Sequence, residues 1–194
     1  MKLLLATSNP HKVEELRRAL PMWEIEAFVA PDPPPEDGVT FEQNAGIKAR
    51  HARDSAPTDA WVAGEDSGIE AAALGGKPGV ESARWADDGV GALLAALAGK
   101  SDRRVRYVCA IVAMSPDGAE IAVSGTLDGV VADGPRGSGG FGYDPIVVPV
   151  GETRTVAELG DAWKATNSHR ARAARAFAEH VTSVWPSGQT RLSP

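Results

Sequence analysis

RVRYVCAIVAMSPDGAEIAVSGTLDGVVA, residues 104–132, is the stretch that decides the fold. It contains two extended, largely apolar runs separated by Pro116-Asp117-Gly118. Extended apolar runs are typical of strands, and a Pro-Asp-Gly sequence between them is typical of a β-turn. We therefore predict a long antiparallel hairpin in this part of the chain.

Strand and helix patterns alternate before the hairpin. Residues 2–7 have the pattern of a buried strand, and a helix is expected from near Pro10, with Val13, Leu16 and Leu20 on one face. The next expected elements are a strand over 25–30, a rigid proline-rich loop over 31–38, and a helix over 41–56 capped by Thr40.

The remaining segments flank the hairpin. Residues 61–74 read as two short strand-like pieces broken at Asp66-Ser67-Gly68, because Asp, Ser and Gly are common turn residues. Further expected elements are a loop over 75–85, a helix over 89–98, a short strand and a polar stretch after residue 145, and a last helix over 168–185. The sequence predicts a mixed α/β fold in a single domain, 1–194, whose last eight or so residues are disordered.

Composition narrows the class of protein. The chain has 194 residues and a net charge of −6, which argues against a nucleic-acid surface because such surfaces are basic. No apolar run is long enough to span a bilayer, and the single cysteine, Cys109, lies in a strand-like run where a small buried residue is expected. We predict a cytoplasmic protein without a membrane partner.

The turn TSNPHK, Thr7 to Lys12, joins the first predicted strand to the first predicted helix. Free N–H groups at a helix start, with hydroxyls and a lysine nearby, suit an anion. A plain helix cap with an exposed lysine is the alternative. The full P-loop pattern is missing from this turn, so an ordinary P-loop NTPase is disfavoured.

Three carboxylates, Glu36, Glu65 and Asp66, form a candidate metal site. A hard divalent ion such as Mg²⁺ takes a few carboxylates together with water and substrate oxygens. Adjacent strand residues point to opposite faces, so Glu65 and Asp66 could share an ion only if the strand ends there. The alternative is a solvated acidic turn.

A basic set near the C-terminus comprises Lys164, His169 and Arg170. Ser168 or Asn167 can cap the last helix, which places His169 and Arg170 in its first turn, where cations oppose the helix dipole. A bound acceptor or anion would compensate them. The alternative is a solvated, arginine-rich helix start.

The loop GSGGFGYDP, residues 137–145, spells the G-x-G-x-x-G pattern of a dinucleotide-binding turn. That motif requires a helix directly after it, and Pro145 disfavours one here. Glycines with exposed aromatic rings at Phe141 and Tyr143 instead suit stacking on a flat base. We predict that this loop binds a base and not phosphate.

Taken together, these motifs resemble the inosine/xanthosine triphosphate pyrophosphatase family, also called Ham1-like. The matching pieces, which run in family order over nearly the whole chain, are LLATSNPHKVEEL, TFEQNAGIKARHA, GEDSGIEAAALGGKPGVESARW, GTLDGVV, GSGGFGYDPI and KATNSHRARA. The resemblance implies an elongated fold with a long, twisted mixed sheet and two lobes around a central cleft. It also implies a homodimer and Mg²⁺-dependent hydrolysis of ITP, dITP and XTP to the monophosphate and pyrophosphate.

The resemblance further assigns roles to residues. It implies that Asp66 is the general base and that Glu36, Glu65 and Asp66 are metal ligands. The implied substrate contacts are Thr7, Ser8, Asn9, Pro10, His11, Lys12, Lys48, Ser67, Phe141, Gly142, Tyr143, Asp144, Lys164, His169 and Arg170. Gln43 stands where a glutamate is common in the family and is left out of the site.

The implied roles of His169 and Arg170 give a chemical reason for preferring hypoxanthine and xanthine over adenine. Hypoxanthine and xanthine present an acceptor oxygen at C6, where adenine presents an amino donor, and an arginine such as Arg170 can only donate. Two alternatives stay open: a Maf-type nucleotide pyrophosphatase with other substrates, which the SHR and FGYDP pieces argue against, and a non-catalytic nucleotide-binding module, which would not need the carboxylates.

Overall fold

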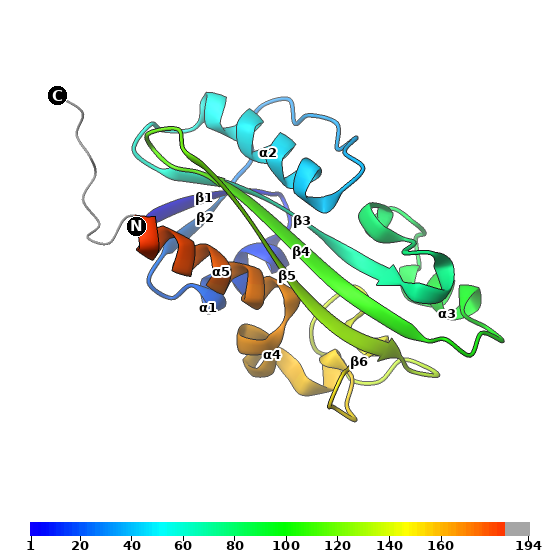
Figure 1. Ribbon diagram of the computed structural model, residues 1–194. Coiled ribbons are helices and arrows are strands. Elements are labelled where there is room, and N and C mark those ends of the chain that lie inside the picture. Colours follow the sequence, from blue (N-terminus) through cyan, green and yellow to red (C-terminus); the bar gives the residue numbers. More distant parts are fainter. Residues whose placement is uncertain (185–194) are drawn as a thin grey trace.

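A long antiparallel hairpin is the main structural element of the fold. The computed structural model describes residues 1–184, and in it β4 (Arg104–Met114) pairs with β5 (Glu120–Val131) from Arg104↔Val130 to Met114↔Glu120. The turn between them is closed by the amide of Gly118, which donates to the carbonyl of Ser115 at 3.0 Å. The predicted hairpin is confirmed (Figure 1).

The hairpin belongs to a six-stranded mixed sheet in the order β2-β1-β3-β4-β5-β6. Its other strands are β1 (Lys2–Ala6), β2 (Glu24–Phe28), β3 (Trp61–Ala71) and β6 (Val147–Pro149). Strand β1 pairs in parallel with β2 and β3, and the remaining pairs are antiparallel. The fold class is the predicted mixed, twisted α/β sheet with flanking helices (Figure 1).

Strand β3 continues past the point where the sequence predicts a break. It pairs with β4 without interruption from Val62↔Met114 to Ala71↔Val105, so the prediction of a turn at Asp66-Ser67-Gly68 is wrong. The physical reason is that continuous ladder bonds to β4 override the turn preference of these residues. By contrast, the pairing of β1 with β3 stops at Ala6↔Gly64, which leaves the other edge of β3 without a β1 partner from Glu65 onward.

Helices cover both faces of the sheet (Figure 1). They are α1 (Pro10–Ala19), α2 (Phe41–Ser55), α3 (Gly89–Ala96), α4 (Val156–Asn167) and α5 (His169–Val184), with short 3-10 helices η1 (Ala72–Leu74), η2 (Gly79–Glu81) and η3 (Asp144–Ile146). Helices α1 and α5 pack in one core with Trp61, Ala63 and Cys109, whereas α2 packs on the opposite face of β3 and β4.

Close packing of α2 on β3 depends on Gly64. A Cβ atom there would lie 2.0 Å from the carbonyl oxygen of Ala45 and 2.7 Å from the amide nitrogen of Ala49. Only glycine permits this approach, because a real Cβ cannot come so near to backbone atoms. The glycine therefore sets how closely α2 lies against the strand that carries Asp66.

Helix α4 is absent from the sequence prediction, which has a polar stretch there. It begins with a capping box in which the Thr155 hydroxyl accepts from the Glu158 amide and the Glu158 carboxylate accepts from the Thr155 amide. Helix α5 follows, and Ser168 caps it as predicted by accepting from the Ala171 amide at 3.1 Å. The predicted disorder of the last residues lies outside the described residues.

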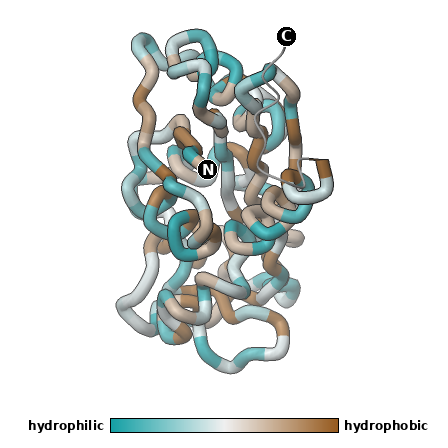
Figure 2. Tube along the Cα trace, turned by 90° about the vertical axis from the view of Figure 1, so that its left-hand side faces the viewer, coloured by the Kyte–Doolittle hydropathy of each residue, from teal (hydrophilic) through white to brown (hydrophobic). Residues whose placement is uncertain are grey.

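Hydrophobic residues occur in short stretches distributed through the fold (Figure 2). Among the helices of residues 1–184, none combines the length and apolar character needed to cross a membrane.

Candidate active site

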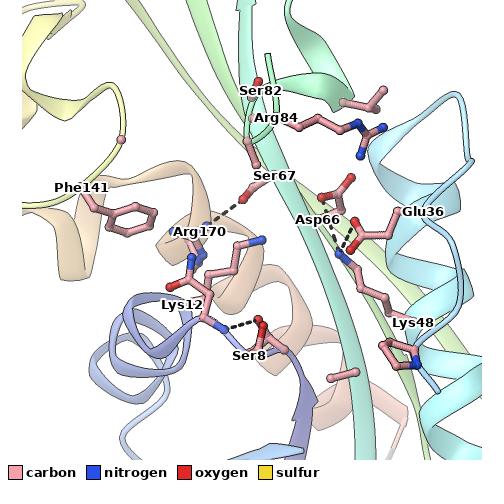
Figure 3. A pocket seen from close by; sticks show the side chains of 18 of the residues that line it. Ser8, Lys12, Glu36, Lys48, Asp66, Ser67, Ser82, Arg84, Phe141 and Arg170 are labelled. Carbon is pink, nitrogen blue, oxygen red and sulfur yellow. Dashed lines mark hydrogen bonds and ion pairs between the residues drawn. The ribbon is translucent and has the colours of Figure 1, made fainter. Parts of the chain in front are cut away.

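A pocket of about 630 Å³ opens where β1 ends and the edge of β3 is left unpaired by β1. Its walls come from the turn before α1, the loop before α2, the glycine-rich loop, and the junction of α4 and α5 (Figure 3). Most of the predicted site residues line it: Thr7, Ser8, Asn9, Lys12, Glu36, Lys48, Asp66, Ser67, Phe141, Gly142, Tyr143, Asp144, Lys164, His169 and Arg170. Pro10, His11 and Glu65 do not line it.

The turn after β1 is shaped by its own polar side chains. The Thr7 hydroxyl accepts from the Asn9 amide at 3.1 Å, and the Asn9 side chain caps α1 by accepting from the His11 amide at 2.9 Å. Pro10, at the first helical position, acts on the backbone and not on the pocket. Asn9 uses its side-chain oxygen for this cap, and Ser8 beside it lines the pocket.

Asp66 lies on the face of β3 covered by α2. Its Oδ2 accepts from Asn44 Nδ2 at 3.0 Å, and its Oδ1 lies 3.6 Å from Lys48 Nζ. Burial raises the pKa of the Asp66 carboxyl, and the nearby cation Lys48 and the hydrogen bond from Asn44 offset only part of that effect. A carboxyl with a raised pKa is a better proton acceptor than an ordinary aspartate.

Glu36 joins Asp66 through a shared cation. Lys48 Nζ lies 2.9 Å from Glu36 Oε2 and 3.6 Å from Asp66 Oδ1, so two carboxylates converge on one positive charge (Figure 3). Within residues 1–184 no group of three metal-ligating side chains is assembled. Two carboxylates nevertheless suit Mg²⁺, which commonly binds through one or two carboxylates and keeps its other positions for water and phosphate oxygens.

Glu65 lies on the opposite face of β3, away from Glu36 and Asp66. Its side chain has no exposed surface, and it pairs with Lys12 Nζ at 2.7 Å and with Arg170 Nη2 at 3.0 Å. Glu65 and Asp66 could share an ion only if the strand ended there. Because β3 continues through both residues, their side chains point to opposite faces of the sheet. The structure therefore does not bring Glu65 to the other two predicted metal ligands.

The electrostatics of Glu65 follow from these ion pairs. Burial alone would raise the pKa of its carboxyl, but the charges of Arg170 and Lys12 outweigh burial and hold that pKa well below its usual value. Burial and the adjacent Glu65 charge raise the pKa of Cys109 well above its usual value, so this thiol stays protonated and donates to Glu65 Oε1 at 3.2 Å.

The glycine-rich loop presents an aromatic face at the far end of the pocket. The ring of Phe141 stacks on His11, with 5.1 Å between centroids and 19° between planes. Lys164 Nζ lies 4.8 Å from the same ring centroid. After Gly142 the chain forms η3 and then β6, so the helix that a dinucleotide-binding turn requires does not follow the loop.

Asp144, at the end of that loop, is buried, and its carboxylate connects three segments of the chain through hydrogen bonds. It accepts from Lys164 Nζ at 2.6 Å, from Tyr107 Oη at 3.1 Å and from the Phe141 amide at 2.9 Å. These bonds hold the glycine-rich loop to β4 and α4. Burial alone would lower the pKa of Lys164, but Asp144 and Glu15 outweigh burial and raise it.

His169 is buried and stacks on Tyr107, with 4.7 Å between centroids and 7° between planes. Burial and the charge of Arg170 lower the pKa of His169 well below 6.5, so the ring is neutral at pH 7. Its Nδ1 atom has no hydrogen-bond partner among the described residues. A neutral ring with an unpartnered nitrogen can bind a ligand atom.

Arg170 is not a solvated helix-start arginine. It is buried, and Glu65 and Glu15 supply the compensating negative charge. Its Nε and Nη2 donate to Glu65, Nη2 also donates to Ser67 at 2.8 Å, and Nη1 donates to Glu15. Those four bonds leave one of its five N–H donors, on Nη1, without a partner among these residues.

Sequence reasoning missed several residues of the site. Glu15 pairs with both Lys164 and Arg170, Asn44 orients Asp66, and Tyr107 contacts Asp144. Arg84 adds a cation to the pocket wall near Asp66 (Figure 3). Glu15 follows Lys12 by three residues on α1, a spacing that places both side chains on one helix face and could have revealed it.

Known proteins are similar to this chain in sequence and fold. The model of the Ham1 family matches residues 3–180. A curated protein named dITP/XTP pyrophosphatase from Symbiobacterium thermophilum is 46% identical over 96% of this chain and 98% of its own length, and one of the same name from Bdellovibrio bacteriovorus is 40% identical over 96% and 100%. The solved structure of the Staphylococcus aureus Ham1 protein has a TM-score of 0.81 at 31% identity, covering 95% of this chain and 100% of that one.

Proposed function

Because the chain belongs to the Ham1 family, we propose that it hydrolyses dITP, ITP and XTP to the monophosphate and pyrophosphate, and so removes deaminated purine nucleotides from the nucleotide pool. The enzyme class that the sequence predicts, a hydrolase of triphosphate anhydrides, is confirmed by the family and by the curated relatives. The substrate set, the metal ion and the roles of individual residues are parts of the proposal.

One observation carries the proposal: a single pocket brings together a carboxylate of raised pKa, a cationic turn and an aromatic loop. Asp66 lies on β3, Lys12 lies in the first turn of α1, and Phe141 lies in the glycine-rich loop. A nucleoside triphosphate has a counterpart for each of the three: a phosphorus at which water attacks, charged phosphates and a flat base.

Asp66 is the proposed general base. Hydrolysis at the α-phosphorus needs a group that takes a proton from the attacking water, and this carboxylate lines the pocket with its pKa raised by burial. Asn44 and Lys48, both on α2, hold its two oxygens. A proton accepted by Asp66 would also weaken its attraction to Lys48.

Glu36 and Asp66 are the proposed ligands of Mg²⁺. They already converge on one cation, the ammonium of Lys48, which shows that their oxygens can stabilise a positive charge there. When bound, Mg²⁺ would offset the negative charge of the phosphate oxygens. Lys48 would then be free to contact phosphate.

The terminal phosphates are proposed to lie at the turn after β1. Ser8 and Lys12 line the pocket there and provide a hydroxyl and an ammonium donor for phosphate oxygens, whereas the Asn9 and His11 amides donate within the turn. Ser67 faces the same pocket from β3.

The base is proposed to stack on Phe141 with its C6 oxygen toward His169 and Arg170. The remaining Nη1 donor of Arg170 and a neutral His169 are available for that oxygen. Adenine would place an amino donor against the arginine and leave buried donors unpaired, which is strongly unfavourable. We also propose that the protein acts as a single-domain, cytoplasmic homodimer, on the basis of the family resemblance.

The test is release of pyrophosphate from ITP, dITP, XTP, ATP, GTP and TTP, with and without Mg²⁺. We expect ITP, dITP and XTP to be hydrolysed with a higher kcat/KM than ATP, and activity to require the ion. Equal rates with ATP and ITP would contradict the proposed specificity.

A further inference from the structure

Glu65 is a carboxylate that substrate cannot touch. Its side chain has no exposed surface and it does not line the pocket, although Asp66 and Ser67 beside it do. It lies in the middle of β3, paired with Ile111 of β4, and it accepts a hydrogen bond from Cys109. The residue is therefore held by the sheet and lies outside the lining of the pocket.

Two cationic side chains that line the pocket both form ion pairs with the carboxylate of Glu65. Lys12 Nζ, from α1, lies 2.7 Å from Oε2, and Arg170 Nη2, from α5, lies 3.0 Å from Oε1. Lys12 and Arg170 lie on different helices and are 158 residues apart in the sequence, since 170 − 12 = 158. In the proposed function Lys12 meets the phosphates and Arg170 meets the base.

An alternative anchor exists for Arg170 but not for Lys12. Glu15 also pairs with Arg170, and it pairs with Lys164 in addition. Among the ion pairs of the described residues, the only one that Lys12 makes is with Glu65. Loss of Glu65 would thus free Lys12 completely and Arg170 in part.

We infer that Glu65 is a positioning residue that fixes Lys12 and Arg170 at one separation, so that the phosphate end and the base end of the nucleotide are bound as a unit. This inference rests on the proposed function. A carboxylate fixed in the sheet is suited to the task, because β3 is bonded along its length to β4 and both cations are attached to helices that share one core with this face of the sheet. The inference also explains why the strand carries two adjacent acids with different partners.

The test begins with Glu65→Gln, which keeps the shape of the side chain and removes its charge. We expect KM for ITP to rise by about tenfold or more with kcat changed by less than about threefold, since Asp66 lies on the other face of β3. Glu15→Gln is the comparison variant, because it loses an anion that pairs with Arg170 and Lys164 but leaves the pair of Lys12 with Glu65 intact. Both variants are compared in binding of tripolyphosphate, a probe of the phosphate end alone, and we expect only Glu65→Gln to weaken it.

A double variant separates positioning from a merely structural role. If Glu65 acts on phosphate through Lys12, then adding Glu65→Gln to Lys12→Gln should weaken tripolyphosphate binding no further. Should Glu65→Gln fail to fold, Glu65→Asp, which keeps the charge on a shorter side chain, is compared in the same way and should also raise KM. An unchanged KM in a folded variant, or additive losses in the double variant, would overturn the inference. Failure of the wild type to hydrolyse ITP would instead reject the proposed function.

Discussion

Glu65 and Asp66 are neighbours in the chain, and their side chains leave β3 on opposite faces of the sheet. Glu65 meets Lys12 and Arg170 under α1 and α5, whereas Asp66 meets Asn44 and Lys48 on α2. One acid is buried with a lowered pKa and the other opens on the pocket with a raised pKa. Two adjacent acids thus have separate roles in the site.

Asp66→Asn should abolish hydrolysis and leave the fold intact. An amide keeps the shape, and its single oxygen can still accept from Asn44, but it cannot take the proton of water, so kcat should fall by about 10²–10⁴-fold. The measurement is pyrophosphate release from ITP at saturating Mg²⁺. Asp54→Asn, an exposed aspartate near the end of α2, is the control and should keep wild-type activity.

Arg170→Ala should destabilise the whole protein and not only change substrate preference. The substitution removes the buried cation that Glu65 and Glu15 share and leaves each acid with one remaining ion pair, to Lys12 and to Lys164 respectively; removal of one partner from a buried ion pair costs about 3–5 kcal/mol. Urea unfolding followed by circular dichroism measures the loss. Arg172→Ala, exposed on the same helix, should change the free energy of unfolding by less than about 1 kcal/mol.

Gly64→Ala should impair catalysis by moving α2. The added methyl would meet Ala45 and Ala49, so the helix must shift outward together with Asn44 and Lys48, the two contacts of Asp66. We expect a loss of about 1–3 kcal/mol in stability and a reduced kcat. Gly134→Ala is the matched control, because nothing lies within 4 Å of its added Cβ; equal effects of the two substitutions would show that the contact with α2 is unimportant.

His169 should make stability depend on pH below about 6.5. Its folded-state pKa lies well below 6.5, because burial and the charge of Arg170 disfavour the protonated ring. The charges of Lys164 and Lys12 also lower this pKa, whereas the charge of Glu65 raises it. The neutral ring of Tyr107 packs against His169. As pH falls below 6.5 the unfolded state binds a proton that the folded state does not, so the free energy of unfolding decreases, by up to about 1.4 kcal/mol per pH unit.

Denaturant unfolding between pH 7.5 and 5.5 tests this dependence. His169→Asn should have a lower free energy of unfolding at pH 7.5 but a smaller slope with pH than the wild type. His180→Asn, exposed on the same helix, should keep the wild-type slope. The same slope in wild type and His169→Asn would mean that other groups cause the dependence.

Local patterns were sufficient to predict much of the fold. The hairpin over residues 104–132 combines extended runs with a turn, and the starts of α1 and α2 have the caps Asn9 and Thr40, so neighbours in the chain determine them. Helix α4 was missed although Thr155 and Glu158 have the spacing of a capping box. Gly160, with non-helical angles inside that helix, weakens the helical pattern.

The sequence was sufficient to predict which residues belong to the site, but not how their side chains are arranged in space. The family resemblance supplied the members of the pocket, from Thr7 to Arg170. Which face of β3 each acid uses depends on whether the strand continues, and that is decided by pairing with β4, some 40 residues later in the chain. The partners of Arg170 are likewise distant in sequence, since Glu15 and Glu65 become its neighbours only through packing.

The buried ion pairs around Arg170 have a consequence for redesign of substrate preference. A library that varies Arg170 alone would sample many destabilised proteins, because each uncharged replacement removes a buried cation that two acids share. Useful variants must change Arg170 together with Glu15 and Glu65, and changing Glu65 also alters Lys12. An attempt to alter base selectivity will therefore tend to alter affinity for the phosphate tail, so the two traits are expected to evolve together.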